Sequence, residues 1–449
     1  MKKGLYLLTI LAMLLQPGLT PWISTPALGM SAGPHAPASA IRYVKPDASG
    51  DCTSWATACG LQPALSGAVS GDEIWVQAGV YKPTIDTNRT VSFDLKSGVA
   101  LYGGFAGTES EAEFDQRDWV NNVTTLSGDL GTARSYHVVR AAGVDSSAVL
   151  DGFTVEKGNA NSGTWPDDSG GGMFNTSGSS PVLANLTFAN NTAGSFGGGM
   201  YNLDSSPILT DVIFYMNSAT DGGGMFNDNS SPTLTDVIFF TNSATSTGGG
   251  IKNYYSNNST LRNVSFISNT AGWGAGMTNQ NSSPELINGV IHGNIADHDG
   301  AGIHNYNSSS PTLVNVTLSD NAAGGAGGGM DSWDDSSPTL NNTILWGNSA
   351  SGSGSQIFKQ SANGTFTLNY SLVEGGCPQY VTCDAHLVTD DPQFVDSASG
   401  NLRLKTNSSA IDAGDNAAVL TGVITDLDGS PRFVDMLGVV DTGNGTSPL

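Results

Sequence analysis

Residues 222–245 read GGGMFNDNSSPTLTDVIFFTNSAT, and this pattern recurs along the middle of the chain. Eight Gly-rich segments end in Met or Ile at intervals of 25 to 27 residues, at Met173, Met200, Met225, Ile251, Met277, Ile303, Met330 and Ile357. A second apolar series keeps the same interval, at Phe188, Phe214, Phe239, Phe266, Ile291, Leu318 and Leu345. A unit this short cannot bury its own apolar face, so successive units must stack on one another.

Each repeat contains three short apolar stretches separated by turn residues. None of them reaches the roughly 10 to 12 residues of a helix, and they are rich in the β-branched and aromatic residues that favour strands. A coil of about 26 residues with three strands corresponds to one rung of a parallel β-helix, in which rungs lie about 4.8 Å apart. The sequence therefore predicts an all-β fold, a single-stranded parallel β-helix.

Columns of like residues are expected along such a stack. One inward column is formed by Leu183, Leu209, Leu234, Leu261, Leu286, Leu313 and Leu340. Asn and Asp tolerate the left-handed backbone of a sharp bend between strands, and they recur at Asn185, Asp211, Asp236, Asn263, Asn288, Asn315 and Asn342. We expect a ladder of side-chain amides that hydrogen-bond from rung to rung, at Asn191, Asn217, Asn242, Asn269, Asn294, Asn321 and Asn348.

The N-terminus has the features of a secretory leader. Lys2 and Lys3 precede an apolar run over residues 5–15, which is too short for a membrane span. Cleavage after Ala27 or after Ala40 fits the surrounding residues. Because no later apolar stretch has membrane-spanning length, we expect a mature chain without an integral membrane segment. The expected location is secreted, or the cell envelope or outer surface of a bacterium.

The four cysteines form two local pairs at opposite ends of the repeats, Cys52 with Cys59 and Cys377 with Cys383. A bridge between the ends would need Cα atoms within about 7 Å, so we predict local disulfides. Both pairs suit an oxidising exterior. Metal ligation is the alternative interpretation.

The charge distribution limits the partners. The formal net charge is −23. Between residues 158 and 358 the only basic side chains are Lys252 and Arg262. Such a surface repels nucleic acid and anionic lipid, whose capture depends on Lys and Arg. It also disfavours an acidic polysaccharide unless cations bridge.

Irregular segments flank the repeats, which gives four expected parts: a signal peptide and Pro-rich leader (1–40), an N-terminal cap with the first irregular rungs (41–137), the β-helix repeats (138–372) and a C-terminal capping segment (373–449). A short amphipathic helix over 60–69 would cover the open end of the stack. We expect the C-terminal capping segment to form irregular rungs. Asp426 and Asp428 are candidate calcium ligands, with a solvated turn as the alternative; no other cofactor is predicted.

The repeats resemble the middle region of chlamydial polymorphic outer membrane proteins. The resemblance lies in Phe214-Tyr-Met-Asn-Ser-Ala219 followed by Gly222-Gly-Gly-Met225. It implies a right-handed β-helix of the pectate-lyase-like kind on a bacterial surface. Two features depart from that family: we expect no transmembrane β-barrel segment in this chain, and residues 441–444 read Asp441-Thr-Gly-Asn444 where related tails have Asp-Ile-Gly-Ala-Tyr-Glu.

Catalysis has candidate residues because parallel β-helices also carry polysaccharide lyases and glycosidases. A glycosidase needs two carboxylates roughly 5 to 9.5 Å apart, and the candidates are Asp167 with Asp168, Asp297 with Asp299, and Asp334 with Asp335. Lys252 and Arg262, the basic residues that a lyase would use, have no acidic cluster near them in the sequence. His292, His298 and His304 could converge on a zinc ion, although their spacing fits no established signature.

A binding surface is the interpretation that we favour. Strand side chains alternate, so the residue after each Met or Ile should point outward; on three consecutive rungs it is Phe174, Tyr201 or Phe226. A second outward row contains Tyr215, Phe240 and Ile267. Aromatic residues in file could stack on sugar rings or on a partner, unless a loop such as 158–168 covers them.

The sequence thus predicts a monomeric, rigid, adhesin-like or carbohydrate- and partner-binding module without catalysis. Its expected partner is an extracellular glycan or a surface protein. The alternative is a carbohydrate-active enzyme, a glycosidase or polysaccharide lyase, that acts on a neutral glycan.

Overall fold

The computed structural model describes residues 39–255, 259–434 and 442–444. These residues divide into two compact units that meet in the sequence at Val237 and Ile238. We call them the N-terminal unit and the C-terminal unit and describe each by itself. The predicted leader lies almost entirely outside the described residues, as does Asp441. None of the helices in the described ranges combines the length and the apolar character needed to cross a membrane.

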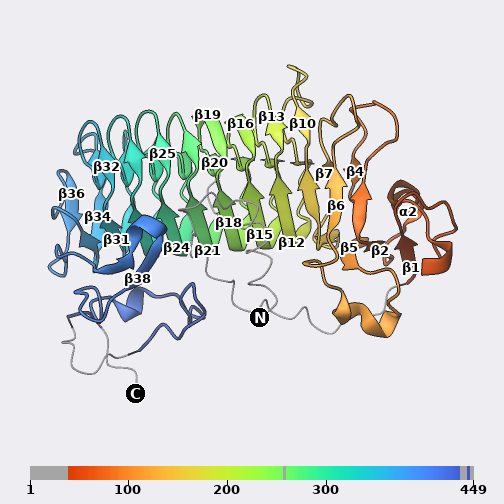
Figure 1. Ribbon diagram of the computed structural model, residues 1–449. Helices are drawn as coiled ribbons and strands as arrows, with labels where there is room; N and C mark the ends of the chain where they lie inside the picture. The colour runs from red at the N-terminus through yellow and green to blue at the C-terminus, as the bar shows by residue number, and fades with distance from the viewer. Residues whose placement is uncertain (1–38, 256–258, 435–441, 445–449) are drawn as a thin grey trace. The chain divides into compact units, whose positions relative to one another are not determined.

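Three parallel sheets make up the N-terminal unit (Figure 1). We name them the long sheet, the Gly-Met sheet, whose repeat strands follow the Gly-rich segments, and the short sheet. The long sheet consists of β1 (Ile41–Val44), β2 (Glu73–Gln77), β3 (Gly79–Tyr81), β5 (Ala100–Phe105), β6 (Thr124–Ser127), β8 (Val149–Asp151), β9 (Thr154–Glu156), β12 (Val182–Ala189) and β15 (Ile208–Tyr215). The Gly-Met sheet consists of β4 (Phe93–Asp94), β7 (Val139–Ala142), β11 (Met173–Thr176), β14 (Met200–Leu203) and β17 (Met225–Asp228). The short sheet consists of β10 (Asn159–Ala160), β13 (Thr192–Ala193) and β16 (Ser218–Asp221).

The C-terminal unit repeats this arrangement. β18 (Thr233–Phe240) spans the boundary in sequence. The long sheet consists of β21 (Thr260–Ile267), β24 (Glu285–His292), β27 (Thr312–Ser319), β30 (Thr339–Asn341), β31 (Ile344–Trp346), β34 (Phe366–Asn369), β35 (Leu372–Val373) and β36 (Val381–Cys383). The Gly-Met sheet consists of β20 (Ile251–Tyr254), β23 (Met277–Gln280), β26 (Ile303–Tyr306), β29 (Met330–Ser332) and β33 (Ile357–Lys359). The short sheet consists of β19 (Ser243–Thr247), β22 (Thr270–Ala271), β25 (Ile295–Ala296), β28 (Ala322–Ala323) and β32 (Ser349–Ala350).

The register of the strands follows the sequence repeat. Met173 pairs with Met200, and Leu183 pairs with Leu209. In the next column the rings of Phe188 and Phe214 stack at 5.0 Å between centroids. Like residues therefore stack on like residues inside the solenoid, and the predicted all-β parallel β-helix is confirmed.

The bends of the long strands have the predicted left-handed backbone. Asn185 and Asp211 have φ of 51° and 55° in the N-terminal unit, and Asn263 and Asn288 have φ of 55° and 56° in the C-terminal unit. Asn and Asp occupy these positions because they tolerate this conformation better than other residues with a side chain.

The predicted amide ladder is confirmed within each unit. Nδ2 of Asn269 donates to Oδ1 of Asn294 at 3.0 Å, and Nδ2 of Asn294 donates to Oδ1 of Asn321 at 2.9 Å. The ladder ends at Asn348, whose Nδ2 donates to Gln356 Oε1 at 2.6 Å. Nε2 of Gln356 in turn donates to a carboxylate oxygen of Glu374 at 2.6 Å.

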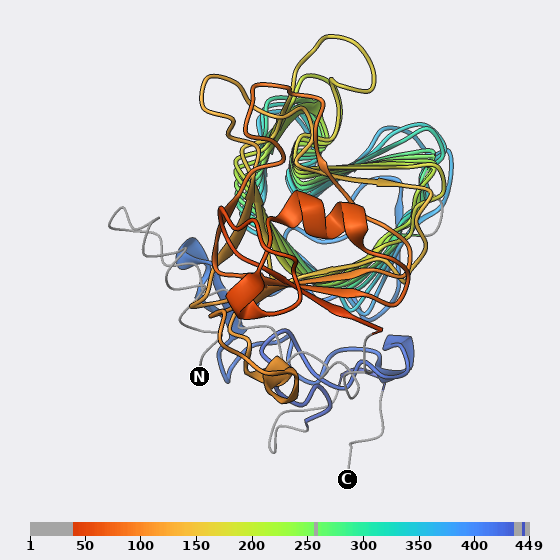
Figure 2. The ribbon, with the colours of Figure 1, turned by 90° about the vertical axis from the view of Figure 1, so that its right-hand side faces the viewer.

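The start of the N-terminal unit is closed by a small cap. Helix α2 (Leu61–Gly67) lies across the end of the strands (Figure 2) and buries Leu61 and Leu65. Val69 lies beyond the helix and is exposed, so the predicted helix was two residues too long at that end. The same part of the chain contains the 3₁₀ helices η1 (Trp55–Thr57) and η2 (Glu111–Gln116).

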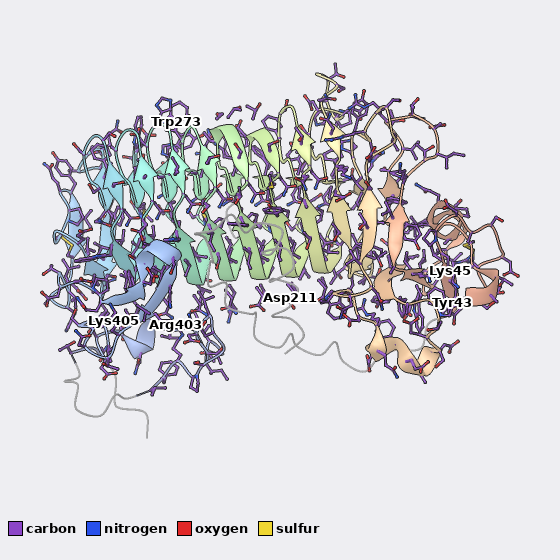
Figure 3. The ribbon with its side chains drawn as sticks, in the orientation of Figure 1. Tyr43, Lys45, Asp211, Trp273, Arg403 and Lys405 are labelled. Carbon is purple, nitrogen blue, oxygen red and sulfur yellow. A yellow bond between two sulfur atoms is a disulfide. The ribbon has the colours of Figure 1, made fainter. Side chains whose placement is uncertain are left out.

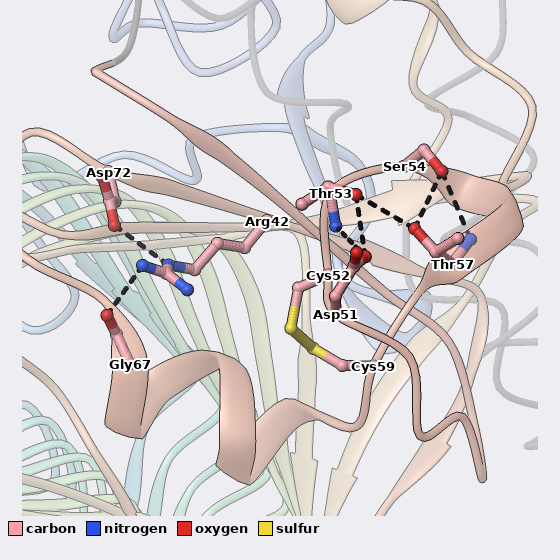
Figure 4. Close-up of a disulfide and its surroundings, with 9 residues drawn as sticks. All are labelled: Arg42, Asp51, Cys52, Thr53, Ser54, Thr57, Cys59, Gly67 and Asp72. Carbon is pink, nitrogen blue, oxygen red and sulfur yellow. Dashed lines mark hydrogen bonds and ion pairs between the residues drawn. A yellow bond between two sulfur atoms is a disulfide. The ribbon is translucent and has the colours of Figure 1, made fainter.

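A disulfide and an ion pair hold this cap together (Figure 4). Cys52 and Cys59 are bonded, with an S–S distance of 2.03 Å. Nε of Arg42 lies 2.9 Å from an oxygen of Asp72, and Nη2 of Arg42 donates to the carbonyl of Gly67 at 2.7 Å. The end of α2 is thereby tied to strand β1.

The tail of the C-terminal unit differs from the expected irregular rungs. Cys377 and Cys383 form the second predicted disulfide, with Cys383 at the end of β36. After Val388 the described strands, β37 (Phe394–Asp396) and β38 (Asn401–Leu404), pair antiparallel with each other. The segment contains η3 (Ser397–Ser399) and η4 (Asn416–Ala418) and turns back along the bends of the long sheet.

Two contacts fix that path. The backbone N–H of Asp415 donates to Asn342 Oδ1 at 2.7 Å, and Nη2 of Arg432 donates to Asn288 Oδ1. The bend residues therefore serve as docking points for the tail.

We predict that Asn294→Ala lowers the free energy of unfolding by about 1 to 3 kcal/mol, because it leaves buried hydrogen-bonding groups of Asn269 and Asn321 without their partner. Urea unfolding followed by circular dichroism measures the effect. Asn363→Ala, at an exposed turn, is the matched control and should be neutral. Equal unfolding midpoints for the two variants would contradict a stabilising role of the ladder.

Candidate functional site

The outer face of the Gly-Met sheet carries the residues that vary most between rungs. In β11, β14, β17, β20, β23 and β26 the Met or Ile and the Asn two places later point inward and are buried, so the residues between and after them face outward. The first outward position holds aromatic residues in the N-terminal unit, at Phe174, Tyr201 and Phe226. In the C-terminal unit the same position holds Lys252, Thr278, His304, Asp331 and Phe358.

The three aromatic residues of the N-terminal unit are not exposed, which corrects the prediction of a surface stripe. Phe174, Tyr201 and Phe226 are 2 %, 3 % and 4 % exposed. Trp165 covers Phe174 at 6.4 Å between ring centroids, and Phe196 lies 5.7 Å from Tyr201 and 4.8 Å from Phe226. The alternative interpretation, coverage by loops, describes this row.

Asp167 and Asp168 hold the covering loop in place. A carboxylate oxygen of Asp167 lies 3.5 Å from Nε2 of His137, and Asp168 accepts a hydrogen bond from Ser195 at 3.0 Å. Burial lowers the pKa of His137, partly offset by a hydrogen bond to the carbonyl of Gly170 and by Asp167. Both carboxylates thus have partners next to the loop, and catalysis by this pair stays a prediction.

The second predicted row, Tyr215, Phe240 and Ile267, lies on the long sheet and is partly buried. Burial raises the pKa of Tyr215. Binding by this row stays a prediction.

A buried dyad of His304 and Asp331 lies on the outer face in the C-terminal unit. Nδ1 of His304 lies 2.8 Å and 2.9 Å from the two carboxylate oxygens of Asp331. His304 is 6 % exposed and Asp331 is fully buried. Burial raises the pKa of Asp331, His304 lowers it and the nearby Asp299 raises it. A carboxylate so placed fixes the orientation of the imidazole ring.

Lys252, Tyr306 and Gln280 form a chain of hydrogen bonds beside this dyad. Nζ of Lys252 donates to the Tyr306 hydroxyl at 2.7 Å and lies 4.9 Å from the centre of its ring. The Tyr306 hydroxyl donates to Oε1 of Gln280. Three rungs therefore contribute to one connected set of polar groups.

Aromatic rings border these polar groups. The ring of Tyr306 stacks near that of His304 at 4.9 Å, and the indole of Trp333 stands edge-on to His304 at 6.1 Å. Nε1 of Trp333 is enclosed and has no hydrogen-bond partner in the described parts of the chain. We call Lys252, Gln280, His304, Tyr306, Asp331 and Trp333 the His304 cluster.

The loop that leads from β22 to β23 adds a further aromatic pair. Trp273 stacks on His298 at 4.1 Å between ring centroids, and Figure 3 places Trp273 at the outer tips of these loops. The hydroxyl of Thr278, from the same row as His304, donates to the carbonyl of Trp273 at 3.2 Å. The loop is thus attached to the outer face that carries the His304 cluster.

The other predicted carboxylate pairs lie in turns. Asp297 is exposed, whereas Asp299 accepts a hydrogen bond from the backbone N–H of Ala326 at 2.5 Å. Asp334 accepts one from the N–H of Asn307 at 3.2 Å, and Asp335 is exposed. Asp299 acts on the His304 cluster through its electrostatic effect on Asp331, and Asp334 directly follows Trp333 in the chain.

The predicted metal ligands have partners of their own. Nδ1 of His292 is hydrogen-bonded to the hydroxyl of Ser319 at 3.1 Å. His298 stacks on Trp273, and Nδ1 of His304 is hydrogen-bonded to Asp331. Within residues 39–255, 259–434 and 442–444, no three His, Cys, Asp or Glu side chains are grouped so that they could hold a metal ion. The three histidines are therefore not brought together.

The candidate calcium ligands of the tail take part in a turn and an ion pair. Oδ1 of Asp426 accepts from the backbone N–H groups of Asp428 and Ser430, at 2.9 Å and 2.8 Å. Asp428 pairs with Nη2 of Arg403 at 2.6 Å. Calcium binding there stays a prediction.

Comparison with known proteins supports the fold. No model of a protein family matches the chain, and no curated protein sequence matches it. The crystal structure of pectate lyase Pel9A is similar, with a TM-score of 0.51 and 14 % identity over 88 % of this chain and 97 % of that chain. A rhamnogalacturonan lyase aligns with a TM-score of 0.33 and 10 % identity, over 80 % of this chain and 91 % of that chain. The chain is a pectate-lyase-like, right-handed parallel β-helix.

We predict that Phe174→Ala lowers the free energy of unfolding by about 3 to 5 kcal/mol, because it leaves a cavity between packed rings. Thermal unfolding by calorimetry measures the loss. Phe358→Ala removes a half-buried ring from the same outward position in the C-terminal unit and should cost clearly less. A Phe174 variant as stable as the wild type would mean that the covering loop does not pack on this row.

Proposed function

We propose that this protein is an extracellular bacterial β-helix that binds a neutral glycan on the His304 cluster without cleaving it. The observation that carries the proposal is the combination of oriented hydrogen-bonding groups with aromatic rings on one outer face. Sugar-binding sites need both, since ring faces stack on the apolar side of a sugar while polar groups bind its hydroxyls. The stacked rungs behind the face act as a rigid scaffold.

The charge of the chain supports a neutral ligand. Lys252 and Arg262 are the only basic residues between 158 and 358, and Lys252 already donates to Tyr306. The surrounding acidic side chains would repel a polyanion. An adhesin-like function in which the glycan belongs to another surface is consistent with this charge.

The proposed location rests on the leader and on the disulfides. Lys2, Lys3 and the apolar run at 5–15 have the pattern of a secretory signal, and two disulfides suit an oxidising compartment. The resemblance to chlamydial surface proteins supports the same location. The division at residues 40, 137 and 372 remains part of the proposal, with the last segment as a C-terminal cap.

The second candidate function is a carbohydrate-active enzyme. The His304–Asp331 dyad favours it, because a carboxylate-oriented imidazole is a general base in many enzymes. The similar structure named a pectate lyase points the same way, although similarity at 14 % identity concerns the fold. Against it, the predicted carboxylate pairs are bonded within loops or exposed in turns.

We expect that Tyr306→Ala combined with Trp333→Ala weakens binding of cellohexaose, xylohexaose or mannohexaose at least about 30-fold, since two aromatic contacts contribute about 2 kcal/mol. Isothermal titration calorimetry measures the affinity for each hexaose. The control is Trp346→Ala, which removes a half-buried indole from the long sheet of the same unit and should leave affinity unchanged. Full binding by the double variant would place the site elsewhere.

Incubation of the purified protein with a panel of neutral polysaccharides should produce neither new reducing ends nor unsaturated products. Reducing-end and ultraviolet assays measure the two products. Turnover that His304→Ala abolishes would establish the enzyme alternative and reject the non-catalytic function.

A further inference from the structure

We propose that His304 and Gln280 recognise two neighbouring hydroxyl groups of one sugar ring, and that Asp331 and Tyr306 are the positioning residues that orient them. This inference rests on the proposed glycan binding and specifies its chemistry. The His304 imidazole supplies an acceptor through Nε2, and the Gln280 amide supplies a donor through Nε2. A neutral sugar with a free vicinal diol is the ligand that this pair fits.

The tautomer of His304 follows from the geometry of Asp331. Both carboxylate oxygens lie at nearly equal distances from Nδ1, 2.8 Å and 2.9 Å. An ionised carboxylate accepts through both oxygens, whereas a protonated one would donate from a single oxygen. Nδ1 therefore carries a proton, and in the neutral imidazole Nε2 keeps its lone pair. Within the described residues Nε2 has no hydrogen-bond partner, and the His304 side chain reaches the surface over only a small area, being 6 % exposed.

The orientation of the Gln280 amide follows from its neighbours. Nζ of Lys252 can only donate, so the Tyr306 hydroxyl accepts from it at 2.7 Å. The same hydroxyl then donates its own proton to Gln280, and the atom that receives it must be Oε1. The Nε2 group of Gln280 is thereby turned away from Tyr306. Its two N–H donors have no protein acceptor in the ranges that the structure describes.

The donor and the acceptor lie on neighbouring strands of one face. Gln280 pairs with Tyr306 across β23 and β26, and Thr278 pairs with His304. Gln280 and His304 are diagonal neighbours, one strand and two residues apart, which corresponds to about 8 Å between their backbones. Two hydrogen bonds to adjacent hydroxyls of one sugar ring can span this separation. Each hydroxyl of a sugar both donates and accepts, so one hydroxyl can donate to His304 while its neighbour accepts from Gln280. The ring centroids of Tyr306 and Trp333 lie 4.9 Å and 6.1 Å from that of His304.

The test compares His304→Phe, Gln280→Met, Asp331→Leu and Asp331→Asn with the wild type. The first two variants approximate the size of the side chain. His304→Phe removes the acceptor together with the hydrogen bond to Asp331, and Gln280→Met removes the donor together with the acceptor of the Tyr306 hydroxyl. Titration calorimetry uses cellohexaose, xylohexaose and mannohexaose and their 2,3-di-O-methyl derivatives. For the hexaose that binds, we expect each of the first two variants to lose about tenfold in affinity, the effect of one hydrogen bond. The methylated derivative should bind at least tenfold more weakly to the wild type.

The positioning function of Asp331 has a separate readout. Nitrogen-15 NMR of the unliganded protein should show a single Nδ1–H tautomer of His304 in the wild type. Asp331→Leu should give a mixture of tautomers with about tenfold weaker binding, while Asp331→Asn, which keeps an acceptor oxygen, should restore part of both. Unfolding midpoints identify any variant that has lost its fold, and Gln280→Met, which leaves the buried dyad intact, then tests the donor independently.

The outcomes separate this inference from the proposed function. Equal binding of methylated and free hexaoses would overturn the recognition of a diol and leave glycan binding in place. An Nε2–H tautomer in the wild type would overturn the function of Asp331. Binding of none of the three hexaoses by the wild type would overturn the proposed function and the diol recognition with it, while the NMR result still decides the orientation of His304.

Discussion

The hydrogen bonds between stacked asparagine amides are the constraint on which the rest of the solenoid depends. In the C-terminal unit Asn294 uses Nδ2 for Asn321 Oδ1 and for the carbonyl of Phe266, both at 2.9 Å. Its Oδ1 accepts from the backbone N–H and from Nδ2 of Asn269, at 2.9 Å and 3.0 Å. Every polar atom of the amide is used, so no other side chain can replace it without an unsatisfied buried group.

The Gly-rich segments are required by the same hydrogen bonds, because those bonds need closely spaced rungs. A Cβ at Gly172 would lie 2.4 Å from the carbonyl oxygen of Gly199 and 2.9 Å from Nδ2 of Asn191. Rungs can approach closely enough for the ladder only where this side chain is absent. The repeat is therefore strict inside the solenoid, and chemical variation is confined to outward positions. The change from Phe174 and Tyr201 in one unit to Lys252 and His304 in the other occurs at one such position.

The sequence predicted those parts of the structure that repeat. The same residue pattern occurs in every repeat, and it predicts the strands, the bends at Asn185 and its equivalents, and the amide ladder. Each repeat therefore supports the prediction made from the others. Burial of Phe174 could not be predicted in this way, because it depends on Trp165 in a loop without equivalents in other rungs. Outward alternation predicts an exposed aromatic row over three rungs, at Phe174, Tyr201 and Phe226. Its extension along the same row would have found His304 and Asp331, which are 27 residues apart and in register.

Gln356 and Glu374, where the amide ladder ends, lie outside the asparagine series and terminate it with groups that no internal rung requires. Duplication or deletion of a whole rung by recombination would therefore preserve the amide ladder and the Gln356–Glu374 pair at its end. We expect homologous genes to differ in length by multiples of one repeat, so that natural selection can adjust the reach of the protein while its outer surface diversifies independently.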